Sequence, residues 1–194
     1  MTMPLMKPKR KNPVLRTRQI NLPPGTRGRV ALGLTAAAAE GRFELQVCAD
    51  CAAVQYPPRE ACHRCLSERL RWREQSGEGR LLSETTLHHS NDLYFRERLP
   101  WRLGMVQLDA GPSVMVHLHG DVQAPATAGD VRVRIGARLD RAGQAVLIGF
   151  PLDGSVHMAD DTMLREMTSD PKFRKVLVTD GKTAVGQALS LIHI

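Results

Sequence analysis

The sequence contains few aromatic residues, with two Trp, two Tyr and four Phe among 194. Proteins that bind single-stranded nucleic acid usually stack bases on aromatic side chains of a barrel face. Two segments that we predict to be strands, 103–109 and 114–119, contain no Phe, Tyr or Trp. This scarcity argues against nucleic-acid binding, although the formal net charge of +7 keeps that class as an alternative.

Long apolar runs are also absent. The longest, residues 30–39, is interrupted by Gly33 and Thr35 and falls well short of the roughly 20 residues that a bilayer span needs. The basic N-terminal residues are not closely followed by an apolar region with a small-residue cleavage site, so no secretory signal is predicted. We therefore expect a cytoplasmic protein that has no membrane span.

A recognisable catalytic constellation is missing as well. No serine stands in a strained nucleophile elbow, and every cysteine belongs to the metal-binding pattern described next. His117 and His119 alternate along a predicted strand and could pair as ligands or bases, but a solvent-facing pair is the favoured interpretation. Residues 1–152 are therefore not expected to catalyse a reaction alone.

Two C-x-x-C pairs are the strongest motif that is present. Cys48 and Cys51 form the first pair and Cys62 and Cys65 the second. Two such turns supply four thiolates, the tetrahedral shell of structural zinc, and leave no position for a reactive water. Disulfide bonds are disfavoured in the cytosol, and rubredoxin-like iron with the same ligands remains the alternative. His63, inside the second pair, is expected to be a bystander.

The surrounding sequence predicts a mainly β protein. Alanine-rich residues 29–40 followed by Gly41 predict a short helix with a glycine cap, and strands are expected at 43–47 and 70–73 on either side of the cysteines. Beyond a joint at 76–79, turn signals separate five β-like runs, at 81–87, 103–108, 114–118, 131–139 and 145–150. Five such runs fit a small barrel of the OB-fold type.

We therefore expect an N-terminal helix and rubredoxin-like zinc ribbon, a five-stranded OB-fold barrel and a short C-terminal β-turn-α fragment. In Val131-Arg132-Val133-Arg134-Ile135 the apolar residues should face the barrel core and the arginines the outside. The expected divisions are a flexible basic arm at 1–28, the helix and ribbon at 29–76, the OB-fold at 77–152, a linker at 153–172 and the start of a truncated Rossmann-like domain at 173–194.

Eight Lys and Arg residues lie in or directly after the basic arm, at positions 7, 9, 10, 11, 16, 18, 27 and 29. Such a segment can attract a polyanion, either nucleic acid or the phosphates of a nucleotide cofactor. A solvated tail is the favoured interpretation.

The region around the cysteines resembles a known family of zinc-ribbon and OB-fold proteins that accompany thiolases and bind acyl-CoA. The positions that carry the likeness are Gly41, Leu45, Gln46, the four cysteines, Tyr56-Pro57-Pro58-Arg59, Ser67, Leu70 and Trp72. The likeness continues through 76–79, Leu99-Pro100, 106–112 and Ile135-Gly136, and so covers roughly residues 29–152. Two departures are Ala52, where a glycine is common, and His63, where a proline is usual.

The resemblance implies a non-catalytic partner that holds CoA thioesters and docks on a thiolase-like or aldolase-like subunit in lipid, sterol or aromatic acyl-CoA metabolism. The four cysteines carry over as zinc ligands, whereas no short motif transfers CoA contacts. Arg96, Arg98 and Arg102 around Trp101 could meet CoA phosphates, but an exposed arginine loop around a buried tryptophan is an equal alternative.

The last residues are similar to the cofactor-binding turn of short-chain dehydrogenases. Thr179 and Gly186 are the positions that carry over to cofactor binding, but Asp180 and Ala184 stand where that family has glycines. A carboxylate beside the pyrophosphate argues against NAD(P) binding. An oxidoreductase activity in a longer fusion chain is therefore an alternative function, and nucleic-acid binding is the other.

Overall fold

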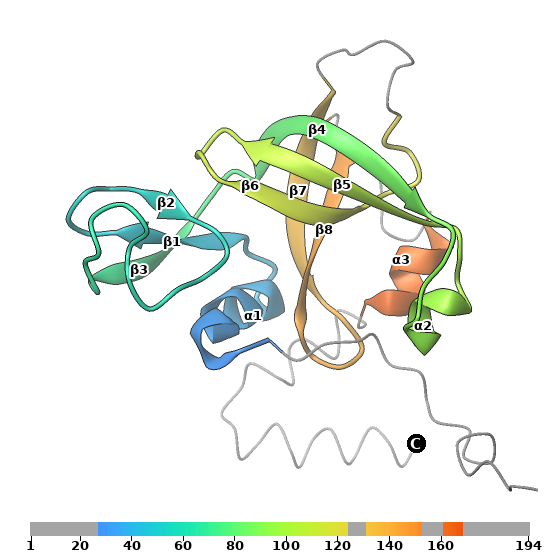
Figure 1. Cartoon of the computed structure of the whole chain (residues 1–194), viewed down its shortest axis with the longest axis horizontal. Coiled ribbons are helices and arrows are strands. Elements are labelled where there is room, and N and C mark those ends of the chain that lie inside the picture. Colours follow the sequence, from blue (N-terminus) through green and yellow to red (C-terminus); the bar gives the residue numbers. More distant parts are fainter. Residues whose placement is uncertain (1–26, 124–130, 153–160, 169–194) are drawn as a thin grey trace, which may run out of the picture.

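The computed structural model describes residues 27–123, 131–152 and 161–168. A small sheet that carries the cysteines lies beside a closed barrel, with the N-terminal helix next to both (Figure 1). The predicted mainly β architecture is thereby confirmed. Most of the basic arm, Thr179 and Gly186 lie outside the described residues.

The predicted N-terminal helix is present as a 3-10 turn, η2 (Arg29–Ala31), followed by α1 (Leu32–Ala39). The helix is followed, after its C-cap Glu40, by Gly41, whose φ of +78° lies in the left-handed region that favours glycine. The Gly41 N–H donates to the Ala38 carbonyl at 3.1 Å, and the Arg42 N–H donates to the Ala37 carbonyl at 2.9 Å. These two bonds form a Schellman motif, which confirms the predicted glycine cap.

The cysteine-bearing module is a three-stranded antiparallel sheet in the order β2-β1-β3. Its strands are β1 (Glu44–Cys48), β2 (Val54–Gln55) and β3 (Leu70–Glu74), which confirms both predicted flanking strands. Helix α1 packs closely on this sheet: a Cβ added at Gly33 would lie 2.1 Å from the Trp72 indole. Only glycine allows this approach, because any side chain would overlap the ring.

The barrel closes in the order β4-β5-β6-β8-β7, with β7 paired back to β4. The only parallel pair described in it joins β6 to β8. This is the Greek-key order of an OB-fold. The strand order therefore identifies the type of barrel, which the number of strands alone does not. All five predicted strands are confirmed, as β4 (Glu78–Leu87), β5 (Trp101–Leu108), β6 (Ser113–Leu118), β7 (Arg132–Leu139) and β8 (Ala145–Pro151).

The barrel interior and the N-terminal lobe share one apolar core. Val133 and Ile135 are buried inside the barrel while Arg134 is exposed, as the alternation predicted. Leu34 of α1 and Leu45 of β1 belong to the same buried cluster as these barrel residues. The zinc-ribbon lobe is therefore fixed to the barrel by burial of apolar surface and not only by the connecting chain.

The joint between the two lobes is itself part of the packing. Gly77 has a φ of +74°, and its carbonyl accepts a hydrogen bond from the Ile135 N–H at 2.8 Å. A Cβ at this position would lie 2.3 Å from the Ile135 carbonyl oxygen. The predicted joint near Gly77 is thus a tight backbone crossing against β7.

Two short helices were not predicted. The segments α2 (Leu93–Arg96) and α3 (Thr162–Met167) place Tyr94, Leu164 and Met167 in a second buried cluster with Trp101 and Ile148. Helix α3 falls within residues 153–172, for which only a linker was expected, because so short a segment shows no helical period. None of the helices in the described ranges has the length and apolar character needed to cross a membrane.

Candidate metal centre and adjoining surfaces

The four cysteines converge on one point, as their spacing predicted. One sulfur from each lies within 4.8 Å of the others. The Cys48 and Cys65 Sγ atoms are 3.5 Å apart, and those of Cys51 and Cys62 are 3.6 Å apart. A tetrahedron of thiolates about 2.3 Å from zinc has sulfur atoms about 3.8 Å apart, so the donor set and its spacing fit this metal. The cluster is a zinc-ribbon site.

Both cysteine turns use the same backbone hydrogen bonds. The Asp50 N–H donates to the Cys48 sulfur, and the Arg64 N–H donates to the Cys62 sulfur, each at 3.4 Å. Hydrogen bonds to sulfur favour the thiolate. The bond from the Cys51 backbone is the largest influence on Cys48, and it helps to lower the pKa of that thiol to about 7.

The four thiols do not ionise independently. The backbone N–H at Ser67 lowers the pKa of Cys65, but the neighbouring thiols and burial outweigh it and raise this pKa to about 12. A cluster of four thiolates therefore needs a cation to offset its charge. With all four positions supplied by protein, a bound zinc ion would link the two turns and leave no site for substrate.

A left-handed residue follows each cysteine pair. Ala52 has a φ of +56° and Leu66 a φ of +62°. The N–H groups of these residues donate to the Cys48 and Cys62 carbonyls, both at 3.0 Å. This conformation costs a residue with a side chain roughly 1–2 kcal/mol, which explains why glycine is common at the position of Ala52 in the family that the sequence resembles.

Two buried glutamines organise the loop between the cysteine pairs. The Gln55 amide nitrogen donates to Gln46 Oε1 at 2.9 Å, and the same oxygen accepts the Arg59 backbone N–H at 2.9 Å. Gln55 Oε1 accepts the His63 backbone N–H at 3.0 Å and lies 3.2 Å from its Nδ1. His63 thus braces the loop and lies outside the cysteine cluster.

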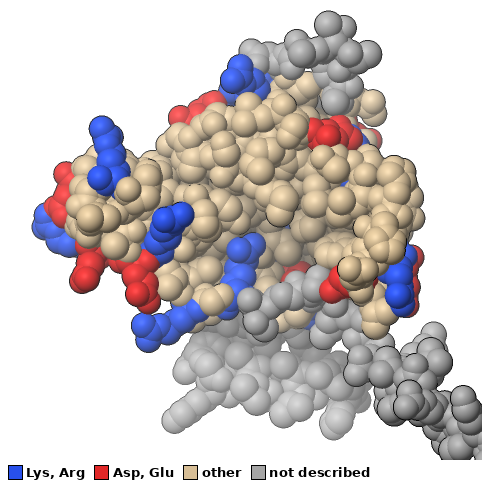
Figure 2. All heavy atoms as spheres, in the orientation of Figure 1, with Lys and Arg blue, Asp and Glu red and all other residues tan. Residues whose placement is uncertain are grey.

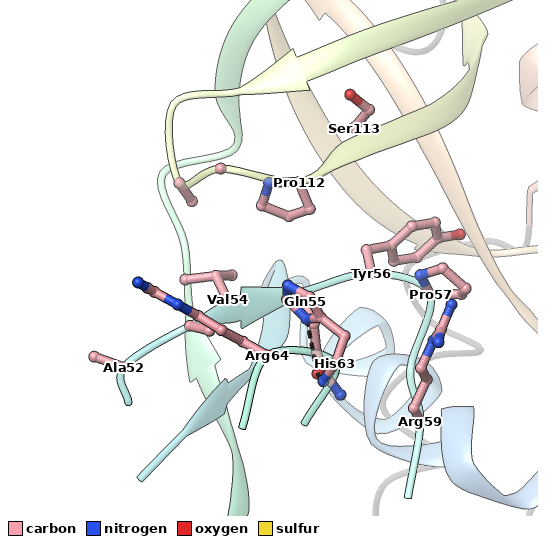
Figure 3. A pocket seen from close by; sticks show the side chains of 13 residues that line it. Ala52, Val54, Gln55, Tyr56, Pro57, Arg59, His63, Arg64, Pro112 and Ser113 are labelled. Atoms are coloured by element: carbon pink, nitrogen blue, oxygen red, sulfur yellow. Dashed lines mark hydrogen bonds between the residues drawn. The ribbon is translucent and has the colours of Figure 1, made fainter. Parts of the chain in front are cut away.

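A cavity of about 520 Å³ lies between this loop and the turn that joins β5 to β6 (Figure 3). We call it the ribbon–hairpin cleft. Its walls come from residues 52–57, Arg59, His63 and Arg64 on the ribbon side and from residues 110–113 on the barrel side. No short sequence motif indicated this cleft, because its two walls are brought together only by the packing of ribbon and barrel.

His117 of β6 and His119, just beyond the end of that strand, are not the solvent-facing pair that we expected. His117 Nδ1 accepts a hydrogen bond from the Trp101 indole at 2.9 Å, and Phe95 of α2 stacks on the ring. His119 is only 1% exposed, and its Nδ1 accepts the Asp121 backbone N–H at 3.2 Å. The expectation was wrong because Phe95 of α2 and Trp101 cover His117, and Phe150 of β8 lies beside the His119 ring.

Two of the three arginines near Trp101, Arg98 and Arg102, have structural partners, whereas Arg96 is exposed. Arg98 lies 4.2 Å from the centre of the Tyr94 ring, and its Nε is 3.2 Å from Glu166. Arg102 pairs with Glu84 at 2.7 Å and donates to the Val122 carbonyl at 2.6 Å. Since Trp101 is 1% exposed, the geometry matches the alternative of an arginine loop around a buried tryptophan.

Replacing a cysteine tests the metal centre. We expect Cys48→Ser and Cys62→Ser to lose stoichiometric zinc and to unfold the ribbon, because three thiolates and a hydroxyl bind zinc far more weakly. Metal analysis and circular dichroism measure the two effects, with the exposed Ala49→Ser as control. Wild-type protein without zinc or iron, or unchanged folding of Cys48→Ser, would contradict this assignment.

His117 should make folding sensitive to mild acid. Burial, with a smaller contribution from the Arg27 charge, lowers its pKa from 6.5 to about 4. Between these values the unfolded chain binds a proton that the folded chain does not, so stability falls as pH drops from 6.5 to 4, by at most about 3 kcal/mol.

His117→Gln keeps an acceptor for the Trp101 indole and should lose less stability than wild type over this range. Denaturant unfolding at several pH values measures the difference, with the exposed His88→Gln as control. Parallel pH profiles for wild type and His117→Gln would refute the assignment.

Comparisons with known proteins agree with both parts of the fold. Residues 35–71 match the family model of the ChsH2 rubredoxin-like zinc ribbon domain, and residues 72–144 match that of the ChsH2 C-terminal OB-fold domain. No curated protein matches the sequence. Neither family match includes Thr179 or Gly186, so the dehydrogenase-like turn stays a prediction.

A solved structure described as "Ltp2-ChsH2(DUF35) aldolase" contains a chain of the same fold. It aligns with a TM-score of 0.55 and 23% identity, over 66% of this chain and 98% of the other. The two adjoining family matches span more than half of the sequence. The chain therefore belongs, through residues 35–144, to the family of ChsH2 zinc-ribbon and OB-fold proteins.

Proposed function

We propose that this chain is a non-catalytic module that binds acyl-CoA and docks on an aldolase-like or thiolase-like partner subunit. The observation that carries the proposal is the alignment over nearly the whole length of a ChsH2 chain from a structure described as an aldolase with Ltp2. In this arrangement the partner supplies the nucleophile, and this chain contributes binding surface.

The described residues support a non-catalytic role. All four cysteine thiols belong to the zinc-ribbon site. The Nδ1 atoms of His117 and His119 already accept hydrogen bonds, from the Trp101 indole and the Asp121 backbone. Within the ranges that the structure describes, we find no nucleophile held against a free base, as nucleophilic catalysis requires.

The outer face of the barrel offers a surface for the partner. Figure 2 shows a broad area without Lys, Arg, Asp or Glu over β5 and β6, while charged side chains lie on the ribbon and along the edges. Met115 is 60% exposed and lies directly opposite Met105 in the β5–β6 register, and Leu82 of β4 is 48% exposed. Methionine-rich apolar surfaces without charge fit the uncharged centre of a protein interface.

A charge placed on this face should prevent docking. We expect tagged wild-type protein to retain a thiolase-like or aldolase-like subunit from its source cells, identified by mass spectrometry, and Met115→Glu to lose it. Leu32→Glu, which changes an exposed leucine of α1, is the matched control. Retention of no such subunit, or equal retention by both variants, would contradict the docking proposal.

Acyl-CoA binding is tested by isothermal titration of the zinc-loaded chain with acetyl-CoA, a medium-chain acyl-CoA and a single-stranded oligonucleotide at two salt concentrations. We expect saturable binding of the CoA esters. Salt-sensitive binding of the oligonucleotide with no response to any CoA ester would instead favour the nucleic-acid alternative. The same titrations on the isolated chain and on its complex show whether the partner completes the site.

A further inference from the structure

We infer that the ribbon–hairpin cleft binds the diphosphate of a nucleotide-type ligand. Under the proposed function, on which this identification of the ligand rests, the diphosphate belongs to the nucleotide end of acyl-CoA. The inference itself is drawn from the shape, charge and rigidity of the cleft.

The charge of the cleft has one sign. Arg59 and Arg64 are among the described residues that line it, and none of those residues is an aspartate or a glutamate. Among the described residues neither arginine side chain has an acidic partner within salt-bridge distance, unlike Arg98 and Arg102. Two guanidinium groups without such a partner in the described ranges suit a ligand with several phosphate oxygens, because each can donate two parallel hydrogen bonds.

The acidic residue that precedes the barrel wall in sequence is already paired. Asp109 immediately precedes residues 110–113, and its two carboxylate oxygens accept hydrogen bonds from Arg132 at 2.8 and 2.5 Å. The Arg132 side chain also holds the pKa of Asp109 below its usual range. This carboxylate is therefore paired on the β7 side of the barrel and does not offset the charge of Arg59 and Arg64.

The ribbon wall of the cleft is rigid. Figure 3 shows Arg59 and Arg64 on either side of Gln55 and His63, below Pro112 of the barrel turn. The Arg59 backbone is fixed by its hydrogen bond to buried Gln46, and His63, next to Arg64, is fixed by Gln55. The backbone positions of the cationic residues are thus set before a ligand arrives, which lowers the entropy cost of binding.

The size of the cleft indicates more than a single phosphate. A volume of about 520 Å³ falls in the usual range of small-molecule sites, and Tyr56, Pro57 and Pro112 add flat apolar surface to its lining. A purine base and ribose attached to the diphosphate could cover that surface. These features together point to a nucleotide in preference to a free inorganic anion.

The test uses zinc-loaded full-length protein and titration with ADP and with inorganic pyrophosphate. We expect both to bind wild type, and ADP to bind more tightly because pyrophosphate lacks the base and ribose. Arg59→Gln and Arg64→Gln should each weaken both ligands by about tenfold to a hundredfold, the usual effect of losing a charge-assisted hydrogen bond. Arg71→Gln, which removes the same charge from an exposed position of β3 outside the cleft, should leave the affinities unchanged.

Three results would overturn the inference: no binding of either ligand to wild type, equal affinities in the Arg59 and Arg64 variants and wild type, or equal weakening by all three substitutions, which would indicate diffuse attraction. Acetyl-CoA separates this inference from the proposed function. If ADP and acetyl-CoA each bind wild type and both cleft variants equally, the cleft assignment fails and acyl-CoA binding stands. If ADP binds in the cleft but acetyl-CoA does not bind, the cleft assignment stands and the proposed acyl-CoA binding fails.

Discussion

The convergence of four thiols on one point is the constraint on which the zinc-ribbon lobe depends. Its strands are short, with β2 consisting of Val54 and Gln55 alone, and its loops contribute little buried apolar surface. Small modules of this kind usually need a metal to offset the entropy of ordering their chain. The metal centre also fixes the loop between the cysteine pairs, so the positions of Arg59 and Arg64 follow from it indirectly.

A second constraint is the contact between α1 and the ribbon sheet. Because Gly33 lets the helix backbone lie against the Trp72 indole, α1 can pack on β3 and at the same time contribute Leu34 to the core that it shares with the barrel. Arg27 strengthens this placement, since its backbone N–H donates to Gln144 Oε1 at 2.9 Å in the turn between β7 and β8. The helix and the residues before it thereby connect the ribbon sheet to the β7–β8 hairpin of the barrel.

Much of the fold could be predicted from local patterns. Alternation identified the strand that contains Val133 and Ile135, a glycine identified the end of the first helix, and cysteine spacing predicted the cluster. What failed depended on distant contacts. His117 was expected to face solvent because its own strand gives no sign that Phe95 and Trp101, from α2 and β5, cover it. The ribbon–hairpin cleft was missed for the same reason, since residues 110–113 and Arg59 meet only in the folded chain.

The apolar core that the ribbon and the barrel share has a consequence for how such proteins can be recombined. Two family models divide the chain at residues 71 and 72, which invites the exchange of a ribbon from one relative with the barrel of another. Here, however, Leu45 of the ribbon lies in the barrel's own core cluster, and Trp72, the first residue on the barrel side of this division, packs against Gly33 of α1. A chimera that ignores these contacts would expose apolar surface on both halves. The ribbon and the barrel should therefore be exchanged together, or with their contact residues matched.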